Sequence, residues 1–223
     1  ERKNRKRSIN VTADVDLTVA NSNEIIASIT NSVLPKILKK YNSISYSFEG
    51  EQQEQGDNLK SLGKNFILAM IVVYMLLAIP FRSYFQPLVV MSSIPFGVTG
   101  AVIGHIIMGM NLSVLSMMGI VALTGVVVND SLVMVDFINR YRKEGNTIKQ
   151  AVLEAGPRRF RPIFLTSLTT FVGLIPLILE KSTQAKFIIP MAVSLSFGVL
   201  FATVITLLLV PVSYLTLEKY ILK

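Results

Sequence analysis

Five long apolar runs after Lys64 constrain this chain more than any other feature. A helix needs about 20 residues to cross the hydrocarbon core of a bilayer, and each run is close to that length. Only 16% of the 223 residues are charged, against about 25% in an average soluble domain. We therefore expect a membrane α-helical bundle of five transmembrane helices within residues 59–223. The predicted spans are approximately 65–81, 87–108, 112–139, 162–180 and 187–214.

Basic residues in the linkers orient this bundle. The linker between the third and fourth runs contains Arg140, Arg142, Lys143, Lys149, Arg158, Arg159 and Arg161. The linker before the third run has no Lys or Arg, and the one after the fourth has only Lys181 and Lys186. Because short cytoplasmic loops carry the excess of Lys and Arg, we expect the richest linker and the C-terminus in the cytoplasm and the N-terminal part outside. This topology accounts for the net charge of +8, so we expect no nucleic-acid partner.

Residues 1–58 have the pattern of a small soluble module. Residues 8–18 and 43–49 alternate apolar and polar side chains, as half-buried strands do. Between them, a capping pattern at Asn21 opens a helix that continues to Lys40. The pattern predicts one β-α-β unit with a right-handed crossover. Two strands and one helix bury too little apolar surface to stand alone, so we expect a fragment whose missing strands come from the remainder of a parent chain.

The third apolar run contains three adjacent polar residues, Asn129, Asp130 and Ser131. Counted back from Arg140, Asp130 lies roughly 15 Å deep in the membrane, where a charged side chain costs about 2.5 to 3.5 kcal/mol. Because burial favours the neutral form of a carboxyl, reversible protonation is within its reach. We interpret the three residues as candidates for a proton relay, and the alternative is a structural carboxyl held by hydrogen bonds. Asp136 lies one helical turn before Arg140 and is expected to form an ion pair at the membrane boundary.

Hydroxyl side chains mark the fourth run. They are Thr166, Ser167, Thr169 and Thr170. Simple rise arithmetic from Arg161 places Thr169 and Thr170 roughly level with Asp130, about 12 to 14 Å into the membrane. Thr166, Thr169, Thr170 and Arg159 therefore join the candidates for the proton relay, with Arg159 at its cytoplasmic mouth. The alternative for each hydroxyl is packing between helices, where Ser and Thr are common.

Small residues in the second run predict close packing of helices. Gly97, Gly100, Ala101 and Gly104 fall on one helical face. His105, the one histidine of the chain, follows them and is interpreted as a packing or interfacial residue. The sequence contains no metal-ligand cluster, phosphate-binding loop or nucleophile–base pair that we recognise. We therefore expect no enzyme activity, no cofactor and no metal site.

Four ordered segments resemble the permeases of the RND (resistance-nodulation-division) efflux pumps. GIVALTGVVVNDSLVMVDFINRYR is similar to their tenth transmembrane helix, and the R-x-R-P-I-x-x-T-S core at residues 159–167 to the start of the eleventh. IPFRSYFQPLVVMSSIPFGVTGA resembles the junction of helices eight and nine, and VITLLLVPVSY resembles helix twelve. The β-α-β unit would correspond to part of a ferredoxin-like periplasmic porter subdomain. The resemblance covers essentially the whole chain.

The resemblance implies a multi-pass permease of the bacterial inner membrane that exports hydrophobic or amphiphilic compounds, multidrug substrates included, by proton antiport. It implies a homotrimer that works with a periplasmic adaptor and an outer-membrane channel in a lipid bilayer. Thr166 and Arg159 match positions of the family's proton pathway. Asn129 stands where the familiar drug pumps have a lysine, so the resemblance implies a modified coupling network.

Two further interpretations stay open at this stage. One is a protein-translocation or lipid- and sterol-related member of the same superfamily. The other is a structural half-bundle that has no activity when isolated. The basic linker and the Leu-Thr-Ser segment at residues 165–167 favour the pump.

Overall fold

The structure, a computed structural model, describes residues 2–3, 6–7, 9, 11–13, 22–41, 44, 46 and 51–220. The chain divides into two compact units, Glu1–Gly50 and Glu51–Lys223. Helices account for most of the described residues of both units.

The described residues of the first unit form two short strands and one interrupted helix. Its elements are β1 (Arg2–Lys3), β2 (Lys6–Arg7), α1 (Ser22–Ser28), the π-helical turn η1 (Ile29–Val33) and α2 (Leu34–Lys40). The two strands pair in antiparallel register. Pro35 in the first turn of α2 has no amide hydrogen for the preceding turn, which accounts for the wider helical turn just before it. The helix predicted to end at Lys40 is therefore present, with an interruption that its apolar spacing did not indicate.

The predicted β-α-β part of a ferredoxin-like subdomain is not supported. The described residues of the two predicted strands are Ile9, residues 11–13, Ile44 and Tyr46, and they lie in no strand. The other residues of 8–18 and 43–49 lie outside the described part of the chain. Ile9 and Val11 are 92% and 91% exposed, although the alternation predicted that they face a core. Alternation alone does not make a strand, because a strand also needs neighbours that take its hydrogen bonds and cover one face.

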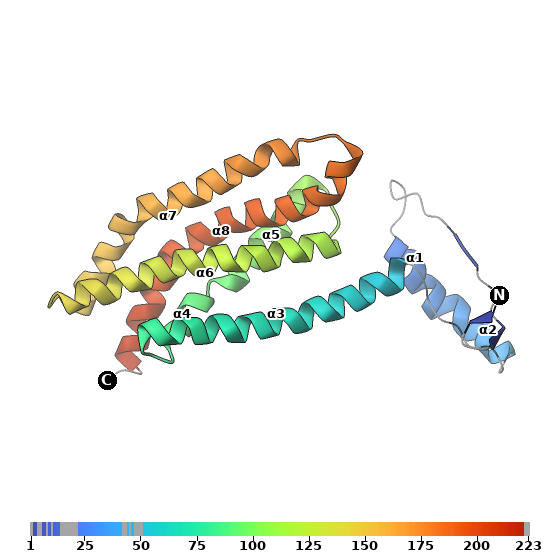
Figure 1. The fold of residues 1–223 in the computed structure, drawn as a ribbon, viewed down its shortest axis with the longest axis horizontal. Coiled ribbons are helices and arrows are strands. Elements are labelled where there is room, and N and C mark those ends of the chain that lie inside the picture. Colours follow the sequence, from blue (N-terminus) through green and yellow to red (C-terminus); the bar gives the residue numbers. More distant parts are fainter. Residues whose placement is uncertain are drawn as a thin grey trace. The chain divides into compact units, whose positions relative to one another are not determined.

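The second unit consists of long helices (Figure 1). They are α3 (Glu51–Phe81), α4 (Gln86–Met91), α5 (Ile94–Met108), α6 (Val114–Lys143), α7 (Ile148–Ile178) and α8 (Thr183–Tyr220). Five segments in the described part of the chain are long and apolar enough to span a membrane: Asn58–Phe81, Gln86–Met108, Val114–Lys143, Ile148–Ile178 and Thr183–Glu218. The predicted helical bundle with five apolar segments is confirmed, and most of the helices extend beyond the predicted limits.

The basic linker predicted between the third and fourth spans is itself mostly helical. α6 continues to Lys143 and α7 begins at Ile148, so only a four-residue turn separates them. Thr147 caps α7 by accepting a hydrogen bond from the backbone N–H of Gln150. Gly145 in this turn has a φ of 92°, a left-handed conformation that favours glycine. The short turn makes α6 and α7 antiparallel neighbours, and it places the basic residues on helix ends.

The second span is broken where α4 meets α5. Pro95 lies in the first turn of α5 and has no amide hydrogen to continue the ladder from α4. The Ser92 and Ser93 hydroxyls donate to the carbonyl oxygens of Val89 and Val90, each at 2.7 Å. Irregular backbone inside a span occurs where protein buries it, and Ser93 is fully buried. The break directs the Ser93 side chain toward α6.

α8 packs against α5, α6 and α7 and is the central helix of the second unit. The predicted small residues Gly97, Gly100, Ala101 and Gly104 are all buried on α5. A Cβ atom at Gly104 would lie 2.5 Å from Cβ of Phe197 on α8. Glycine on this face therefore lets α5 approach α8 closely, as in other membrane helix pairs.

α3 exposes most of its apolar side chains. Ile67, Leu68, Leu76 and Ile79 are each more than 60% exposed: 63%, 61%, 63% and 73%. A contiguous apolar surface of this kind on a long helix is unfavourable in water and favourable in hydrocarbon. The exposure pattern therefore agrees with a membrane environment for the second unit.

Candidate functional site

Asp130 lies near the middle of α6 and is only 5% exposed. Sixteen residues of α6 precede it and thirteen follow it, so it is about 20 Å or more from either end of the helix. An ionised carboxylate so far from water is unfavourable unless a partner stabilises it. The polar groups next to Asp130 therefore decide whether its charged form is stabilised.

Ser167 of α7 is the polar neighbour of this carboxylate. Its Oγ lies 3.4 Å from Oδ2 of Asp130, 3.1 Å from the carbonyl oxygen of Ile163 and 2.5 Å from Oγ1 of Thr203 on α8. Thr203 in turn donates to the carbonyl oxygen of Val199 at 2.8 Å. Ser167 and Thr203 are both buried. The single hydroxyl hydrogen of Ser167 thus has three acceptors within reach, and one of them is ionisable.

A second pair of hydroxyls includes Ser131, the residue that follows Asp130 on α6. The Oγ atoms of Ser131 and Ser93 are 2.7 Å apart, and either residue can donate. Both side chains are fully buried. We call Asp130, Ser93, Ser131, Ser167 and Thr203 the Asp130 cluster. Through it, the middle of α6 bonds to α7 and the α4–α5 break, and α7 bonds in turn to α8.

Four predicted relay residues other than Arg159 lie outside this cluster. Asn129 is exposed on α6, Thr166 and Thr169 are exposed on α7, and Thr170 is half-buried. The hydroxyl of Thr166 donates to the carbonyl oxygen of Pro162, and those of Thr169 and Thr170 donate to the carbonyl oxygen of Thr166. Their hydrogen bonds therefore stay within α7 and bring none of these side chains to Asp130.

Arg159 is half-buried and attaches the first part of α7 to the end of α6. Its guanidinium carbon lies 4.9 Å from the centre of the Phe137 ring, a cation–π contact. Its Nε is buried without a hydrogen-bond partner. Arg159 lies eight positions before Ser167, which corresponds to about 12 Å of helix, so Arg159 lies well away from Asp130.

Three members of the Asp130 cluster were not among the predicted relay residues. Ser93 precedes the proline that breaks the second span, and this break was a signal that sequence reasoning left unused. Ser167 belongs to the hydroxyl ladder of the fourth run, but its neighbours were preferred. Thr203 carries no distinguishing signal, because single hydroxyls are common in membrane helices.

The predicted boundary ion pair is confirmed. Arg140 donates through an Nη atom to Oδ2 of Asp136, one helical turn away, and the two side chains are 70% and 38% exposed. Water screens an exposed pair at this spacing, so it contributes little to stability. Asp136 is therefore distinct in environment from Asp130, although both are carboxylates of α6.

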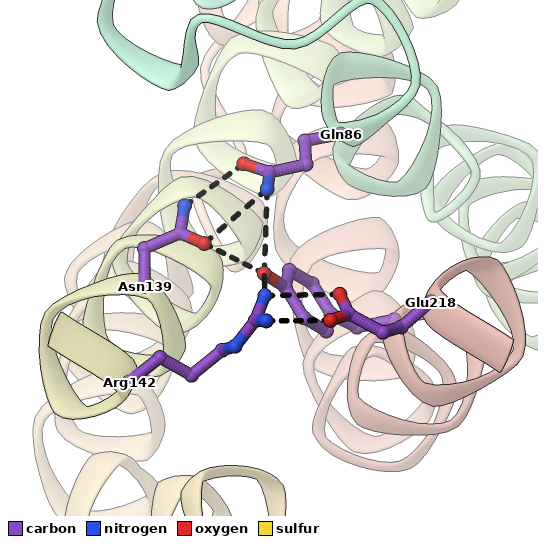
Figure 2. Close-up of polar contacts among 5 residues, drawn as sticks. Gln86, Asn139, Arg142 and Glu218 are labelled. Carbon is purple, nitrogen blue, oxygen red and sulfur yellow. Dashed lines mark hydrogen bonds and ion pairs between the residues drawn. The ribbon is translucent and has the colours of Figure 1, made fainter. Parts of the chain in front are cut away.

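A second polar network joins the ends of α4, α6 and α8 that lie toward the α6–α7 turn (Figure 2). Its five residues are Gln86, Asn139, Arg142, Tyr214 and Glu218, and we call them the polar clamp. Gln86 and Asn139 exchange amide hydrogen bonds of 2.8 and 3.3 Å, and the Tyr214 hydroxyl donates to Oδ1 of Asn139 at 2.7 Å. Arg142 binds both carboxylate oxygens of Glu218, at 2.5 and 2.9 Å. The Tyr214 side chain is fully buried.

His105 is buried at the other end of the bundle. Its Nε2 lies 2.8 Å from Oγ of Ser116, and its Nδ1 lies 3.0 Å from the carbonyl oxygen of Ala101. Because a carbonyl only accepts, Nδ1 donates to it, so the neutral ring accepts from Ser116 at Nε2. Ser116 and Ser113 form the capping box that opens α6. His105 therefore fixes α5 to the start of α6, which agrees with its interpretation as a packing residue.

The family described as AcrB/AcrD/AcrF matches residues 1–218 of this chain. The chain is 32% identical over 218 residues to the swarming motility protein SwrC of Bacillus subtilis, which covers 96% of this chain and 20% of that protein. It is 30% identical over 217 residues to the multidrug resistance protein MdtC of Erwinia tasmaniensis, covering 95% and 20%. The chain thus spans about a fifth of the length of the curated relatives that it matches.

Two solved structures, both crystal forms of a heavy metal efflux pump, share the fold. Form II superposes with a TM-score of 0.72 at 22% identity, over 87% of this chain and 19% of that one. Form I superposes with a TM-score of 0.70 at 25% identity, over 84% and 20%. The arrangement of the helices is therefore found in a crystallised efflux pump.

Proposed function

The chain belongs to the AcrB/AcrD/AcrF family of RND efflux permeases, and on this premise we propose that it is the C-terminal transmembrane portion of a proton-driven exporter. The transport cycle would couple proton entry to export of a hydrophobic or amphiphilic compound. The observation that carries the proposal is Asp130, a buried carboxyl at mid-span with a hydroxyl donor of α7 beside it.

The hydroxyl of Ser167 links the charge on Asp130 to the packing of three helices. A hydrogen bond to a charged acceptor contributes about 1.5 to 3 kcal/mol, against about 1 kcal/mol for a neutral one. When Asp130 is ionised, the Ser167 hydrogen therefore favours Oδ2 of Asp130. When Asp130 binds a proton, Ser167 turns to the carbonyl oxygen of Ile163 or to Thr203 on α8. Protonation thus changes which helix α7 is bonded to, and such a change is what coupling of protons to motion requires.

Membrane topology and assembly follow the family. The basic ends of α6 and α7 would face the cytoplasm together with the C-terminus, and the first unit would lie in the periplasm. The full permease would be a homotrimer in the inner membrane that works with a periplasmic adaptor and an outer-membrane channel. Asn129, Thr166, Thr169 and Thr170 present polar groups on exposed faces of α6 and α7. In the parent chain these groups, with Arg159 at the cytoplasmic mouth, would line the remainder of the relay.

The names of the relatives point to different activities, so the substrate has to be proposed separately. One relative is named for swarming motility, one for multidrug resistance, and the crystallised pump for heavy metals. Among the described residues there is no group of three His, Cys, Asp or Glu side chains that would hold a metal ion. We favour an amphiphile as the exported compound, because the described helices supply an apolar membrane surface.

The test is proton-dependent efflux by the full-length parent protein, with Asp130→Asn compared to wild type at equal membrane abundance. Efflux of a panel of amphiphilic dyes is measured with and without a proton gradient. We expect Asp130→Asn to abolish the part of efflux that depends on the gradient, because the amide does not titrate. Asp136→Asn is the matched control, since it removes a carboxylate of the same helix from an exposed ion pair, and it should keep that efflux. Equal efflux by wild type and Asp130→Asn would make Asp130 a packing residue.

A further inference from the structure

Gln86, Asn139 and Tyr214 meet in a buried contact at the ends of three helices (Figure 2). The Tyr214 hydroxyl donates to Oδ1 of Asn139 at 2.7 Å, and it accepts from Nε2 of Gln86 at 3.3 Å and from Arg142 at 3.4 Å. Tyr214 is 0% and Gln86 7% exposed. If a buried polar group lacks its partner, its desolvation destabilises the fold and no hydrogen bond offsets that cost. The three helices are therefore stable in the axial alignment that keeps all of these contacts together.

The ion pair of Arg142 and Glu218 also favours this one axial alignment of α6 with α8. Arg142 and Glu218 make two parallel hydrogen bonds, a geometry that depends on the position of both groups. Their side chains are 36% and 22% exposed, so water screens the pair only in part. A slide of α8 along α6 by one helical turn, about 5.4 Å, would separate the amide, hydroxyl and ionic contacts at once.

The helices that carry the polar clamp also carry the Asp130 cluster. On α6, Asn139 lies nine residues beyond Asp130, and on α8, Tyr214 lies eleven residues beyond Thr203. These spacings correspond to about 14 and 16 Å of helix. The cluster and the clamp thus join α6 and α8 at two positions along the bundle, and the distance between these positions is nearly the same on both helices.

The third helix also contributes to both networks, at a shorter spacing of about 10 Å. Gln86 lies in the first turn of α4, and Ser93 lies seven residues later at the break before α5. Ser93 meets Ser131 in the cluster, and Gln86 meets Asn139 in the clamp. In the described residues no side chain of α7 is bonded to the clamp, although α7 supplies Ser167 to the cluster. The clamp therefore aligns three of the four helices of the cluster and makes no side-chain bond to the fourth.

We propose that the polar clamp sets the axial register of α4, α6 and α8, so that its residues align Ser93 with Ser131 and Thr203 with Ser167, the hydroxyl that contacts Asp130. The clamp residues are positioning residues, because none of them touches the carboxyl itself. Their link to proton coupling rests on the proposed function. The axial register that they set is a property of the fold, so it can be measured without measuring transport.

The chain has no cysteine, so a cysteine pair reports this register directly. The Ser93 and Ser131 hydroxyls are 2.7 Å apart, and a disulfide needs its sulfur atoms about 2.05 Å apart. In the full-length parent protein, with cysteines outside this chain replaced, Ser93→Cys and Ser131→Cys are oxidised in native membranes. The rate of disulfide formation is then compared with and without Tyr214→Phe. This substitution keeps the buried ring and removes the hydroxyl about 16 Å from Thr203.

We expect Tyr214→Phe to slow disulfide formation about fivefold, the effect of losing about one net hydrogen bond from the aligned state. Tyr84→Phe, at a side chain that is 78% exposed, is the matched control and should leave the rate unchanged. Arg142→Glu and Glu218→Arg should each slow the reaction, and the double variant with the exchanged pair should restore most of the rate. Rescue by exchange distinguishes a defined alignment from a general loss of stability.

An unchanged rate in Tyr214→Phe at normal membrane abundance overturns the proposal. If that variant is not produced, Glu218→Gln keeps the size of the side chain and answers the same question. Proton-dependent efflux is measured on the same variants with the native serines, and we expect it to fall in proportion to the disulfide rate. The disulfide readout needs no transport, so the two proposals can fail separately. If the wild-type parent shows no proton-dependent efflux while Tyr214→Phe still slows disulfide formation, the proposed function is refuted and the proposed register stands.

Discussion

Gly119→Ala tests the close approach of α6 and α8 on which the Asp130 cluster depends. A Cβ atom at residue 119 would lie 2.5 Å from the carbonyl oxygen of Met191 and 2.9 Å from Cβ of Ser194, whereas ordinary contact begins at 3.4 Å. The oxygen belongs to the backbone of α8 and has no rotamer that avoids the new methyl group. The two helices must therefore separate by about 0.9 Å at this point, which loosens a densely packed interface.

The magnitude follows from two opposing effects. Overpacking of a tight interface costs about 1 to 3 kcal/mol, and a backbone clash belongs at the upper end of that range. Alanine is the better helix former by about 1 kcal/mol. Gly119→Ala should therefore destabilise the bundle by about 2 kcal/mol. Gly156→Ala on α7 is the matched control, because a Cβ atom there has no neighbour within 4 Å, and it should be neutral or stabilising by up to about 1 kcal/mol.

Equilibrium unfolding of the purified parent protein in detergent, followed by helix content, measures both variants. The difference between them removes the propensity effect that they share, and it should be about 2 to 3 kcal/mol. Equal stabilities of Gly119→Ala and Gly156→Ala would refute the close contact of α6 with α8, and with it the geometry derived for Thr203. Proton-dependent efflux should fall in Gly119→Ala alone, because the change separates the helices that surround Asp130.

Two further substitutions test single contacts. Ser167→Ala removes the hydroxyl shared by Asp130, Ile163 and Thr203, and proton-dependent efflux should fall about fivefold, as expected for one hydrogen bond. The control is Thr99→Ala, at an exposed hydroxyl bonded only within α5, which should change proton-dependent efflux less than about twofold. Equal effects of the two substitutions would exclude a special role of Ser167. His105→Leu removes the bonds to Ser116 and Ala101 and should lower the unfolding free energy by about 1 to 2 kcal/mol. An unchanged unfolding curve for His105→Leu would show that the start of α6 does not depend on this ring.

The position of the buried carboxyl was predictable because it depends on length and composition alone. Apolar runs of about 20 residues identify a span whatever its neighbours are, and Asp130 lies inside one of them. The boundary pair of Asp136 and Arg140 was equally local, since residues four apart meet on any helix. Motif order along the chain also carried the family resemblance, which the family match over residues 1–218 bears out.

The partners of Asp130 were beyond the reach of the sequence. Rise along the axis places Thr169 and Thr170 level with the carboxyl, but each residue also rotates by about 100° around the axis. Only the packing of α7 against α6 and α8 decides that Ser167 faces inward and that its neighbours do not. The β-α-β prediction is not supported in the described residues, and the physical ground is the same, because alternation specifies a face and not what covers it.

The sequence by itself thus determined how many apolar spans the described part of the chain contains, roughly where each one lies and which of them has a carboxyl near its middle. Those properties depend on interactions within about 20 neighbouring residues. The tertiary structure alone decided the bonding of Ser167, the junction of Ser93 with Ser131 and the polar clamp, because they join residues 36 to 128 positions apart. Rotation and axial register of whole helices set such contacts, and no local pattern records either quantity.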